Sequence, residues 1–173
     1  TGSYGQLGNE LTKILKNGRA EIGEISPAYS GCEIIAVDYD TLDITDKDAV
    51  QAFIQEHQPD IIFNCAAMTN VDQCETDFET AMKVNAIGPR NLARAAKQTG
   101  AKLVHVSTDY VFSGTQATPR CEWDLCAPNT VYGKSKLLGE RYAMEQCPNT
   151  FVVRTAWLYG YVGKNFVKTM LRL

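Results

Sequence analysis

The chain has 173 residues, 45% hydrophobic and 21% charged, so its length and composition fit one packed domain and a fragment of a second. It carries 17 basic and 20 acidic residues and no basic run, which excludes the positive surface typical of a nucleic-acid-binding protein. No apolar run approaches the ~18 residues of a membrane span and no leader pattern opens the chain, so we expect a cytoplasmic globular domain.

The first part of the chain begins with a helical pattern. Leucine and isoleucine recur at helical spacing after Gly8, and the helix is predicted to stop near Asn17-Gly18. Residues 19–32 contain glycine, proline and serine and are predicted to form a loop. Residues 33–37 (EIIAV) are predicted to form a short buried strand.

The middle of the chain continues the alternation. Asp46 is expected to cap a helix that ends at Pro59, and residues 61–63 are predicted to form the next strand. A long helical pattern then runs from about residue 77 to 99, and Gly88-Pro89 inside it is expected to kink the helix.

The last third has the same order of elements. A strand is predicted over 102–107, followed by a loop to about residue 129, a helix over 130–146, a strand over 151–154 and the start of a helix at 164. Strands that alternate with helices are typical of βαβ units. The predicted fold is therefore α/β, a doubly wound parallel sheet of the Rossmann-like, NAD(P)-binding kind.

Glycines at the start of the chain indicate a nucleotide site. Gly2, Gly5 and Gly8 have the spacing G-x-x-G-x-x-G and lead directly into a helix. Such a loop allows a tight turn, a close approach of backbone to a pyrophosphate, and a helix N-terminus directed at the negative charge. The alternative is a glycine-rich surface turn. The strand that normally comes before such a loop is expected to precede Thr1.

Asp38 follows the predicted strand 33–37, where the ribose of an adenine nucleotide usually binds. A carboxylate there accepts hydrogen bonds from a 2′-hydroxyl and repels a 2′-phosphate, which favours NAD over NADP. The alternative is an acidic residue that only ends the strand.

Tyr132 and Lys136 lie four residues apart on a predicted helix and so share one face. An ammonium beside a phenol lowers the pKa of the phenol, which favours proton transfer to a carbonyl oxygen. Ser107 and Thr108 end the preceding strand at the carboxyl edge of the sheet, where a hydroxyl can polarise the same oxygen. The alternative is a solvated helix face.

The cysteines are predicted to be reduced thiols. No C-x-x-C motif occurs, and a core-rich chain of this size does not need disulfides. No metal site is predicted. The six positions are Cys32, Cys65, Cys74, Cys121, Cys126 and Cys147.

Taken in order, the segments TGSYGQLG, NCAAMTNVDQCE, VNAIGPRNLA, VHVSTDYVFSG, YGKSKLLGE and VRTAWLYG closely resemble the extended short-chain dehydrogenase/reductases. The resemblance covers essentially the whole chain. Members of that family are longer, so the resemblance implies that the first strand and most of the substrate-binding portion lie outside these residues. It implies a cofactor domain at 1–154 and the start of a substrate portion at 155–173.

The resemblance also implies site residues. Gly5, Gln6 and Leu7 would hold the pyrophosphate, Asp43 and Ile44 would flank the adenine, and Ala66, Ala67 and Thr69 would line the ribose and nicotinamide. Thr108, Tyr132 and Lys136 would form the catalytic set, with Tyr132 and Lys136 also at the cofactor, and Thr108, Asp109 and Trp157 would contact substrate. Trp157 as a core aromatic, or Asp109 as a loop cap, are the alternatives.

The implied activity is transfer of a hydride from NADPH or NADH to the C4 ketone of a dTDP-linked 6-deoxy-sugar. The alternatives are a sugar-nucleotide epimerase or dehydratase of the same superfamily, and a non-catalytic regulatory subunit that keeps the cofactor site. The expected partner is the dTDP-sugar, with neither nucleic acid nor membrane; a homodimer is compatible with the resemblance.

Overall fold

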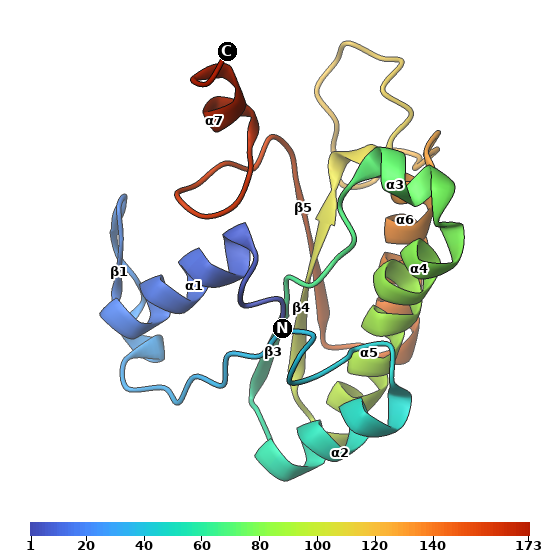
Figure 1. Cartoon of the computed structure of the whole chain (residues 1–173). Helices are drawn as coiled ribbons and strands as arrows, with labels where there is room; N and C mark the ends of the chain where they lie inside the picture. Colours follow the sequence, from blue (N-terminus) through green and yellow to red (C-terminus); the bar gives the residue numbers. More distant parts are fainter.

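A parallel three-stranded sheet forms the centre of the computed structural model, which describes residues 1–173 (Figure 1). The strands lie in the order β3 (Ile61–Asn64), β4 (Lys102–Thr108) and β5 (Thr150–Thr155), and both pairs are parallel. The predicted strands at these three places and their parallel arrangement are confirmed, with each strand extended by one or two residues. All three carboxyl ends therefore lie at one edge of the sheet, where residues from different segments can meet.

The helices lie where the periodicity predicts them, and a short helix after β3 was not foreseen. In chain order they are α1 (Gln6–Asn17), α2 (Lys47–His57), α3 (Val71–Thr76), α4 (Phe78–Met82), α5 (Gly88–Thr99), α6 (Val131–Gln146) and α7 (Phe166–Met170). Three single turns, η1 (Pro27–Tyr29), η2 (Lys83–Ile87) and η3 (Asp109–Val111), connect them.

Local signals set the helix ends. The side chain of Asp46 accepts hydrogen bonds from the backbone N–H groups of Asp48 and Ala49, which caps α2 as predicted. Gly18 and Gly100 adopt positive φ after α1 and α5, a conformation that costs glycine little and that ends both helices.

The helical pattern predicted at 77–99 is present as α4, η2 and α5, and the hydrogen bonding becomes π-helical just before Gly88-Pro89, where a kink is predicted. A π-helical turn, η2, separates α4 from α5, and Pro89 follows in the first turn of α5. Proline has no N–H to donate to the carbonyl four residues earlier, here that of Asn85, so the regular helix cannot continue. The π-helical turn η2 packs closely against α6, because a Cβ on Gly139 of α6 would lie 2.1 Å from the carbonyl oxygen of Asn85.

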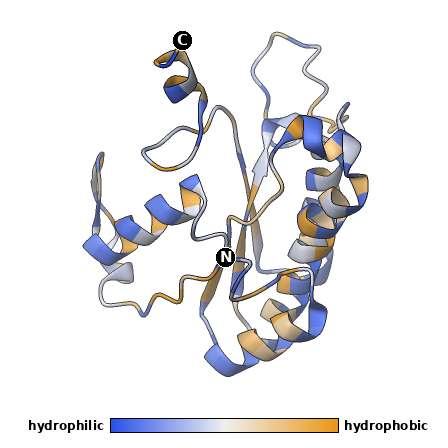
Figure 2. Ribbon diagram, viewed as in Figure 1, coloured by the Kyte–Doolittle hydropathy of each residue, from blue (hydrophilic) through white to orange (hydrophobic).

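The core lies between the sheet and the layer formed by α2, α5 and α6 (Figure 1). Leu103 of β4 belongs to the same buried cluster as Leu92 of α5 and Ala143 of α6. Figure 2 shows hydrophobic residues on the strands and on the side of these helices that faces them. The opposite face of the sheet is only partly covered, since Phe151 of β5 is 57% exposed and Val153 is also exposed.

The predicted strand at residues 33–37 is wrong for this structure. The stretch is hydrophobic (Figure 2) but pairs with no other strand. Its one backbone hydrogen bond toward the sheet is donated by Ser3 N to Val37 O. Thr1 lies between this stretch and β3, donating to Phe63 O and accepting from Cys65 N. A strand needs a continuous neighbour to pair with, and Thr1 supplies a single residue of one.

The predicted loop at 19–32 contains more structure than expected. Two short strands, β1 (Arg19–Ala20) and β2 (Gly23–Glu24), pair antiparallel, and η1 follows them. They form a small hairpin beside α1, away from the main sheet (Figure 1).

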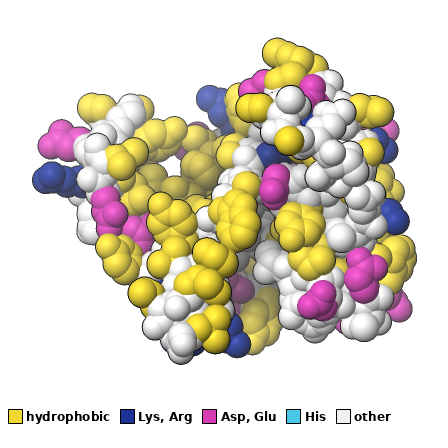
Figure 3. Space-filling model, turned by 90° about the horizontal axis from the view of Figure 1, so that it is seen from above, with side chains coloured by type: hydrophobic (Ala, Val, Ile, Leu, Met, Phe, Trp, Pro, Cys, Tyr) yellow, Lys and Arg dark blue, Asp and Glu magenta, His cyan; other side chains and the backbone are white.

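A cleft of about 640 Å³ separates residues 33–37 from β3. Its walls are mostly apolar and come from α1, α2, residues 33–37 and β3. Seen from above in Figure 3, hydrophobic side chains line a hollow between the α1 side of the molecule and the sheet. The cleft thus has apolar walls and unpaired backbone on both sides.

Candidate active site

The glycine loop packs directly on the end of β3. Gly2 has a φ of +70°, and a Cβ at this position would lie 2.5 Å from the backbone N of Ala66. A Cβ on Gly8 would lie 2.1 Å from the carbonyl oxygen of Gly2. Both positions therefore require glycine, and the loop is held beside Ala66 and Ala67, which the resemblance places at the cofactor.

The N-terminus of α1 is open to an anion. Gly5 is the N-cap, no side chain caps the helix, and its first turn carries no acidic residue. The first backbone N–H groups of a helix lack acceptors within the helix, and together with the helix dipole they favour a phosphate. Gly5, Gln6, Leu7 and Gly8 thus lie in a cradle that fits the predicted pyrophosphate.

Gln6 also links this cradle to the C-terminal segment. Its side-chain Oε1 accepts a hydrogen bond of 2.8 Å from Asn165 Nδ2, and Asn165 also donates to Gly160 O. The predicted cofactor loop and the predicted substrate portion, more than 150 residues apart in sequence, are therefore in contact.

Asp38 lies beside the glycine loop, although the strand expected before it does not form. Its Oδ2 accepts a 2.7 Å hydrogen bond from Tyr4 N, and its Oδ1 accepts one from Tyr39 N. The carboxylate is thus fixed next to the loop, as a ribose-binding acid requires.

Asp43 and Ile44 are placed differently from one another. Asp43 is exposed and accepts a hydrogen bond from Thr45 N, whereas Ile44 is buried in the core, where a Cβ on Gly88 would meet its side chain. In this structure the Ile44 side chain packs against α5 and its carbonyl accepts a hydrogen bond from Asn91 Nδ2, so the predicted contact of its side chain with adenine is not formed by an exposed surface. Thr69 is exposed just before α3.

The three predicted catalytic residues converge at the carboxyl edge of the sheet. Thr108 ends β4, and its side-chain hydroxyl lies beside the phenol of Tyr132 on α6. Lys136, one turn further along α6, donates a 2.7 Å hydrogen bond from Nζ to Val106 O of β4. The ring of Tyr110 contacts that of Tyr132 edge-on at 5.4 Å between centroids. The side chains of Thr108, Tyr132 and Lys136 are all buried, so Tyr132 and Lys136 do not lie on a solvated helix face.

The electrostatics of the tyrosine differ from the sequence-based expectation. Burial raises the pKa of Tyr132, and hydrogen bonding with Thr108 offsets this only in part, while Asp109 adds to the increase. The prediction that Lys136 lowers this pKa is wrong in this structure. The reason is geometric, since the ammonium is directed to the carbonyl of Val106.

Burial has the opposite effect on the lysine. The pKa of Lys136 falls to about 8 because the ammonium loses water, although Glu140 and Cys65 both favour the charged form. Its charge in turn adds to burial in lowering the pKa of His105 well below the usual value, so that imidazole is neutral. Lys136 is therefore poised to change charge close to neutral pH.

Two functional residues escaped the sequence analysis. Asn85, in the π-helical turn η2, bonds both the N–H and the C=O of Met68 and donates 3.1 Å from Nδ2 to Ser135 Oγ on α6. Ser135 Oγ in turn donates to Tyr132 O. Asn85 therefore connects the loop at 66–69 with the catalytic helix. The expected helix break at Gly88-Pro89 was the one available signal for it.

A second buried polar group supports the end of β3. Asn64 Oδ1 accepts from Thr1 Oγ1 and from Ala66 N, and Asn64 Nδ2 lies 3.1 Å from His105 Nδ1. The side chain thus fixes the turn that carries Ala66 and Ala67 against β4. Its position at the end of a predicted strand was visible in the sequence, but its partners were not.

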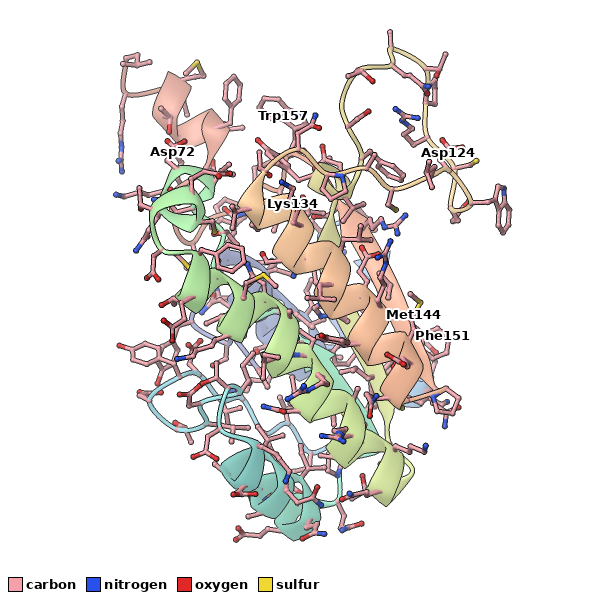
Figure 4. All side chains as sticks on the ribbon, turned by 90° about the vertical axis from the view of Figure 1, so that its right-hand side faces the viewer. Asp72, Asp124, Lys134, Met144, Phe151 and Trp157 are labelled. Carbon is pink, nitrogen blue, oxygen red and sulfur yellow. The ribbon has the colours of Figure 1, made fainter.

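The predicted substrate residues lie above this edge. Asp109 accepts a 3.0 Å hydrogen bond from Thr108 Oγ1, and its side chain is exposed. Trp157 is 73% exposed and packs edge-on against Phe166 of α7, so the alternative of a core aromatic is wrong. Figure 4 shows Trp157 at the same end of the molecule as Lys134, near the start of α6.

All six cysteines are free thiols; four are buried or half-buried, and Cys32 and Cys121 are exposed. No group of three or more His, Cys, Asp or Glu residues is arranged to hold a metal ion. None of the helices has the length and hydrophobicity needed to cross a membrane.

Residues 1–173 match the family described as RmlD substrate binding domain. The dTDP-4-dehydrorhamnose reductase of Aggregatibacter actinomycetemcomitans is 44% identical over 174 residues, which cover 100% of this chain and 55% of the relative. The crystal structure of a dTDP-4-dehydrorhamnose reductase from Clostridium acetobutylicum superposes with a TM-score of 0.90 at 46% identity, covering 99% of this chain and 56% of that one. The enzyme of that name from Bacillus anthracis, solved in complex with NADP, has a TM-score of 0.86 at 45% identity, with coverage of 99% and 57%. This chain spans about half the length of these relatives.

Proposed function

Because this chain belongs to the RmlD substrate binding domain family, we propose that it is the cofactor-binding and catalytic part of a dTDP-4-dehydrorhamnose reductase. The reaction is the NADPH- or NADH-dependent reduction of the C4 ketone of dTDP-4-dehydro-L-rhamnose to dTDP-L-rhamnose. The observation that carries the proposal is the meeting of Thr108, Tyr132 and Lys136 at the carboxyl edge of the sheet, next to the glycine loop.

The residues present fit a dinucleotide. Gly2 and Gly8 allow the loop to pack tightly, since a Cβ at either position would meet backbone at 2.5 or 2.1 Å, and α1 offers uncapped N–H groups to a pyrophosphate. Asp38, held by Tyr4 N, is placed to accept hydrogen bonds from ribose hydroxyls. When bound, the reduced nicotinamide supplies the hydride for the ketone carbon.

Tyr132 supplies the proton. Its raised pKa keeps the phenol protonated at neutral pH, so it can donate to the substrate oxygen as negative charge develops there. The Thr108 hydroxyl lies beside this phenol and donates to the same substrate oxygen in exchange for its bond to Asp109. The ketone gains one hydride on carbon and one proton on oxygen and becomes the alcohol.

Lys136 keeps a positive charge at the base of the site. With a pKa of about 8 it is mostly protonated at neutral pH, and its ammonium is available to stabilise the Tyr132 phenolate once it leaves the carbonyl of Val106. We also assign to it a hydrogen bond with the nicotinamide ribose, in exchange for the bond to Val106 O.

The domain boundaries follow from this assignment. Residues 1–154 form the cofactor domain, and residues 155–173, with Trp157, begin the portion that binds the sugar nucleotide. A parallel strand joined to Thr1 would complete the ladders on both sides of the apolar cleft. The cytoplasmic location and the homodimer stay predictions.

The test is a turnover assay with a polypeptide in which this chain is extended at both ends to the length of its relatives, called the extended protein below. It is given dTDP-4-dehydro-L-rhamnose with NADH or NADPH, and loss of nicotinamide absorbance is followed. Stoichiometric oxidation of either cofactor is expected. Conversion of the sugar without net oxidation would indicate an epimerase or dehydratase, and cofactor binding without any conversion would indicate a regulatory subunit.

A further inference from the structure

A buried ion pair lies one helical turn beyond Lys136. Glu140 of α6 is fully buried, and both of its carboxylate oxygens accept hydrogen bonds from Arg154 near the end of β5. The distances are 2.9 Å from Nε and 2.6 Å from Nη2, a two-pronged arrangement that fixes orientation as well as charge. The proposed mechanism does not use either residue.

The same guanidinium holds the segment that follows η3. Arg154 Nη2 donates to Cys126 Sγ at 3.3 Å, and Arg154 Cζ lies 5.1 Å from the centroid of the Phe112 ring. Arg120 packs on the same ring at 5.4 Å. One side chain of β5 therefore contacts both α6 and residues 112–126, which leave the sheet beside Thr108.

The pair shares a face with the catalytic residues. Tyr132, Lys136 and Glu140 are spaced four residues apart on α6, and all three are buried. Burial of the Glu140 carboxylate removes its hydration and costs free energy, and Arg154 offsets this cost because it supplies an opposite charge in good geometry. We propose that Glu140 and Arg154 are positioning residues for the catalytic face of α6, which fix the helix against β5 and hold a buried carboxylate one helical turn from the Lys136 ammonium.

The electrostatics agree with the geometry. Among the charged groups around Lys136, Glu140 has the largest effect in favour of the ammonium, against the stronger effect of burial. Arg154 acts through Glu140, because its guanidinium donates to both oxygens of that carboxylate. The other titratable groups near Lys136 are Cys65 after β3, His105 on β4 and, one helical turn away on α6, Tyr132, whose own neighbour is Asp109 in η3. On the α5 side, Arg90 contacts Tyr142 and Arg94 contacts Gln146, both further along α6.

The consequence for catalysis rests on the proposed function, so the test has one readout that is independent of turnover. Lys136 is observed in the extended protein by the ¹³Cε resonance of labelled lysine, assigned by its loss in Lys136→Met. Glu140→Gln keeps the shape and one acceptor for Arg154 but removes the charge. We expect the titration midpoint of Lys136, about 8 in the parent, to move to lower pH by about one unit, and the high-pH limb of kcat to move with it.

A matched control removes a carboxylate from the surface. Glu79 pairs with Lys83, four residues further along the chain, which is the spacing that separates Lys136 from Glu140, but both of these side chains are exposed. Glu79→Gln is expected to leave the Lys136 midpoint and the pH profile unchanged. If Glu140→Gln does not fold, Glu140→Gln combined with Arg154→Met removes both charges and leaves an apolar side chain against Phe112, and the same acidic shift is expected.

The outcomes separate the two claims. An unchanged Lys136 midpoint in the folded Glu140 variants, single or double, would overturn the assignment, whatever happens to the rate. A shifted midpoint in a protein that reduces no dTDP-sugar would support the positioning pair and contradict the proposed function. A shifted midpoint with a shifted kcat profile supports both.

Discussion

The side-chain amide of Asn85 pairs with both peptide groups of Met68. Its Oδ1 accepts from Met68 N at 2.9 Å and its Nδ2 donates to Met68 O at 2.9 Å. Seventeen residues separate the two in sequence, and the π-helical turn η2 turns Asn85 toward the loop. Because Met68 lies between Ala67 and Thr69, this pairing fixes the loop predicted to hold the ribose and nicotinamide.

Asn85→Ala is expected to loosen that loop. Two buried backbone groups of Met68 lose their partner, which should lower the free energy of unfolding by about 3 kcal/mol, and a displaced loop should weaken cofactor binding by roughly tenfold or more. Denaturant unfolding and cofactor titration of the extended protein measure the two effects.

Thr150→Val is the control for this prediction. The Thr150 hydroxyl is half-buried and donates to the backbone carbonyl of Ala143, but it lies at the start of β5, at the opposite end of the strand from the carboxyl edge. The control should lose some stability and keep its cofactor affinity. Equal losses of affinity in both variants would mean that Asn85 acts only through overall stability.

Tyr132→Phe removes the proposed proton donor and keeps the ring that packs against Tyr110. General acid catalysis typically contributes about 10²–10⁴-fold, so kcat should fall by that factor with little change in cofactor affinity. Steady-state kinetics of the extended protein, with cofactor titration beside them, check this. Near-normal turnover would exclude Tyr132 as the donor.

Gly5→Val tests the cradle without breaking the fold. Gly5 has a φ of −66°, which valine adopts, and a Cβ there meets only Gly2 O, at 3.3 Å. The added side chain should stand where the pyrophosphate approaches α1, so the affinity for NADH and for NADPH should both fall. Gly8→Ala, whose Cβ would lie 2.1 Å from Gly2 O, should instead destabilise the loop itself. Unchanged cofactor affinity in a folded Gly5→Val protein would show that the loop is a surface turn that does not bind the pyrophosphate.

Lys136→Met should raise stability at neutral pH while it abolishes turnover. The folded-state pKa of Lys136, about 8, lies below its ordinary value of 10.5, so the unfolded chain binds more protons between these two pH values. The loss of folding stability caused by burying the ammonium is therefore complete below a pH of about 8 and disappears as the pH rises to about 10.5. The Tm advantage of the variant should be larger at pH 7 than at pH 10. An advantage independent of pH would show that the lysine is not a buried charge.

Much of the fold was predictable from local pattern. The parallel sheet could be predicted because apolar runs such as 102–107 alternate with segments of helical periodicity. A strand that is buried on both faces is apolar throughout, and a helix that is buried along one stripe has apolar residues at helical spacing. The Tyr132–Lys136 pair and the glycine spacing were visible for the same reason. Both are set by residues within one turn or one loop.

Other features depend on partners far along the chain. Residues 33–37 have the composition of a strand, yet they form none here, because a ladder is a property of two segments. The upward pKa shift of Tyr132 arises from burial beneath neighbouring elements, and the ammonium expected to oppose it is turned to Val106. Neither the depth of burial nor the direction of a lysine side chain can be read from spacing.

The sequence by itself therefore determined which residues can do chemistry and on which element each one lies, since helix and strand periods are local. Tertiary structure alone decided what surrounds them: Asn85 beside Met68, and Glu140 with Arg154 beneath the catalytic face of α6. These contacts are made by polar side chains that water would otherwise solvate, and only packing of distant segments removes that water and makes each bond specific.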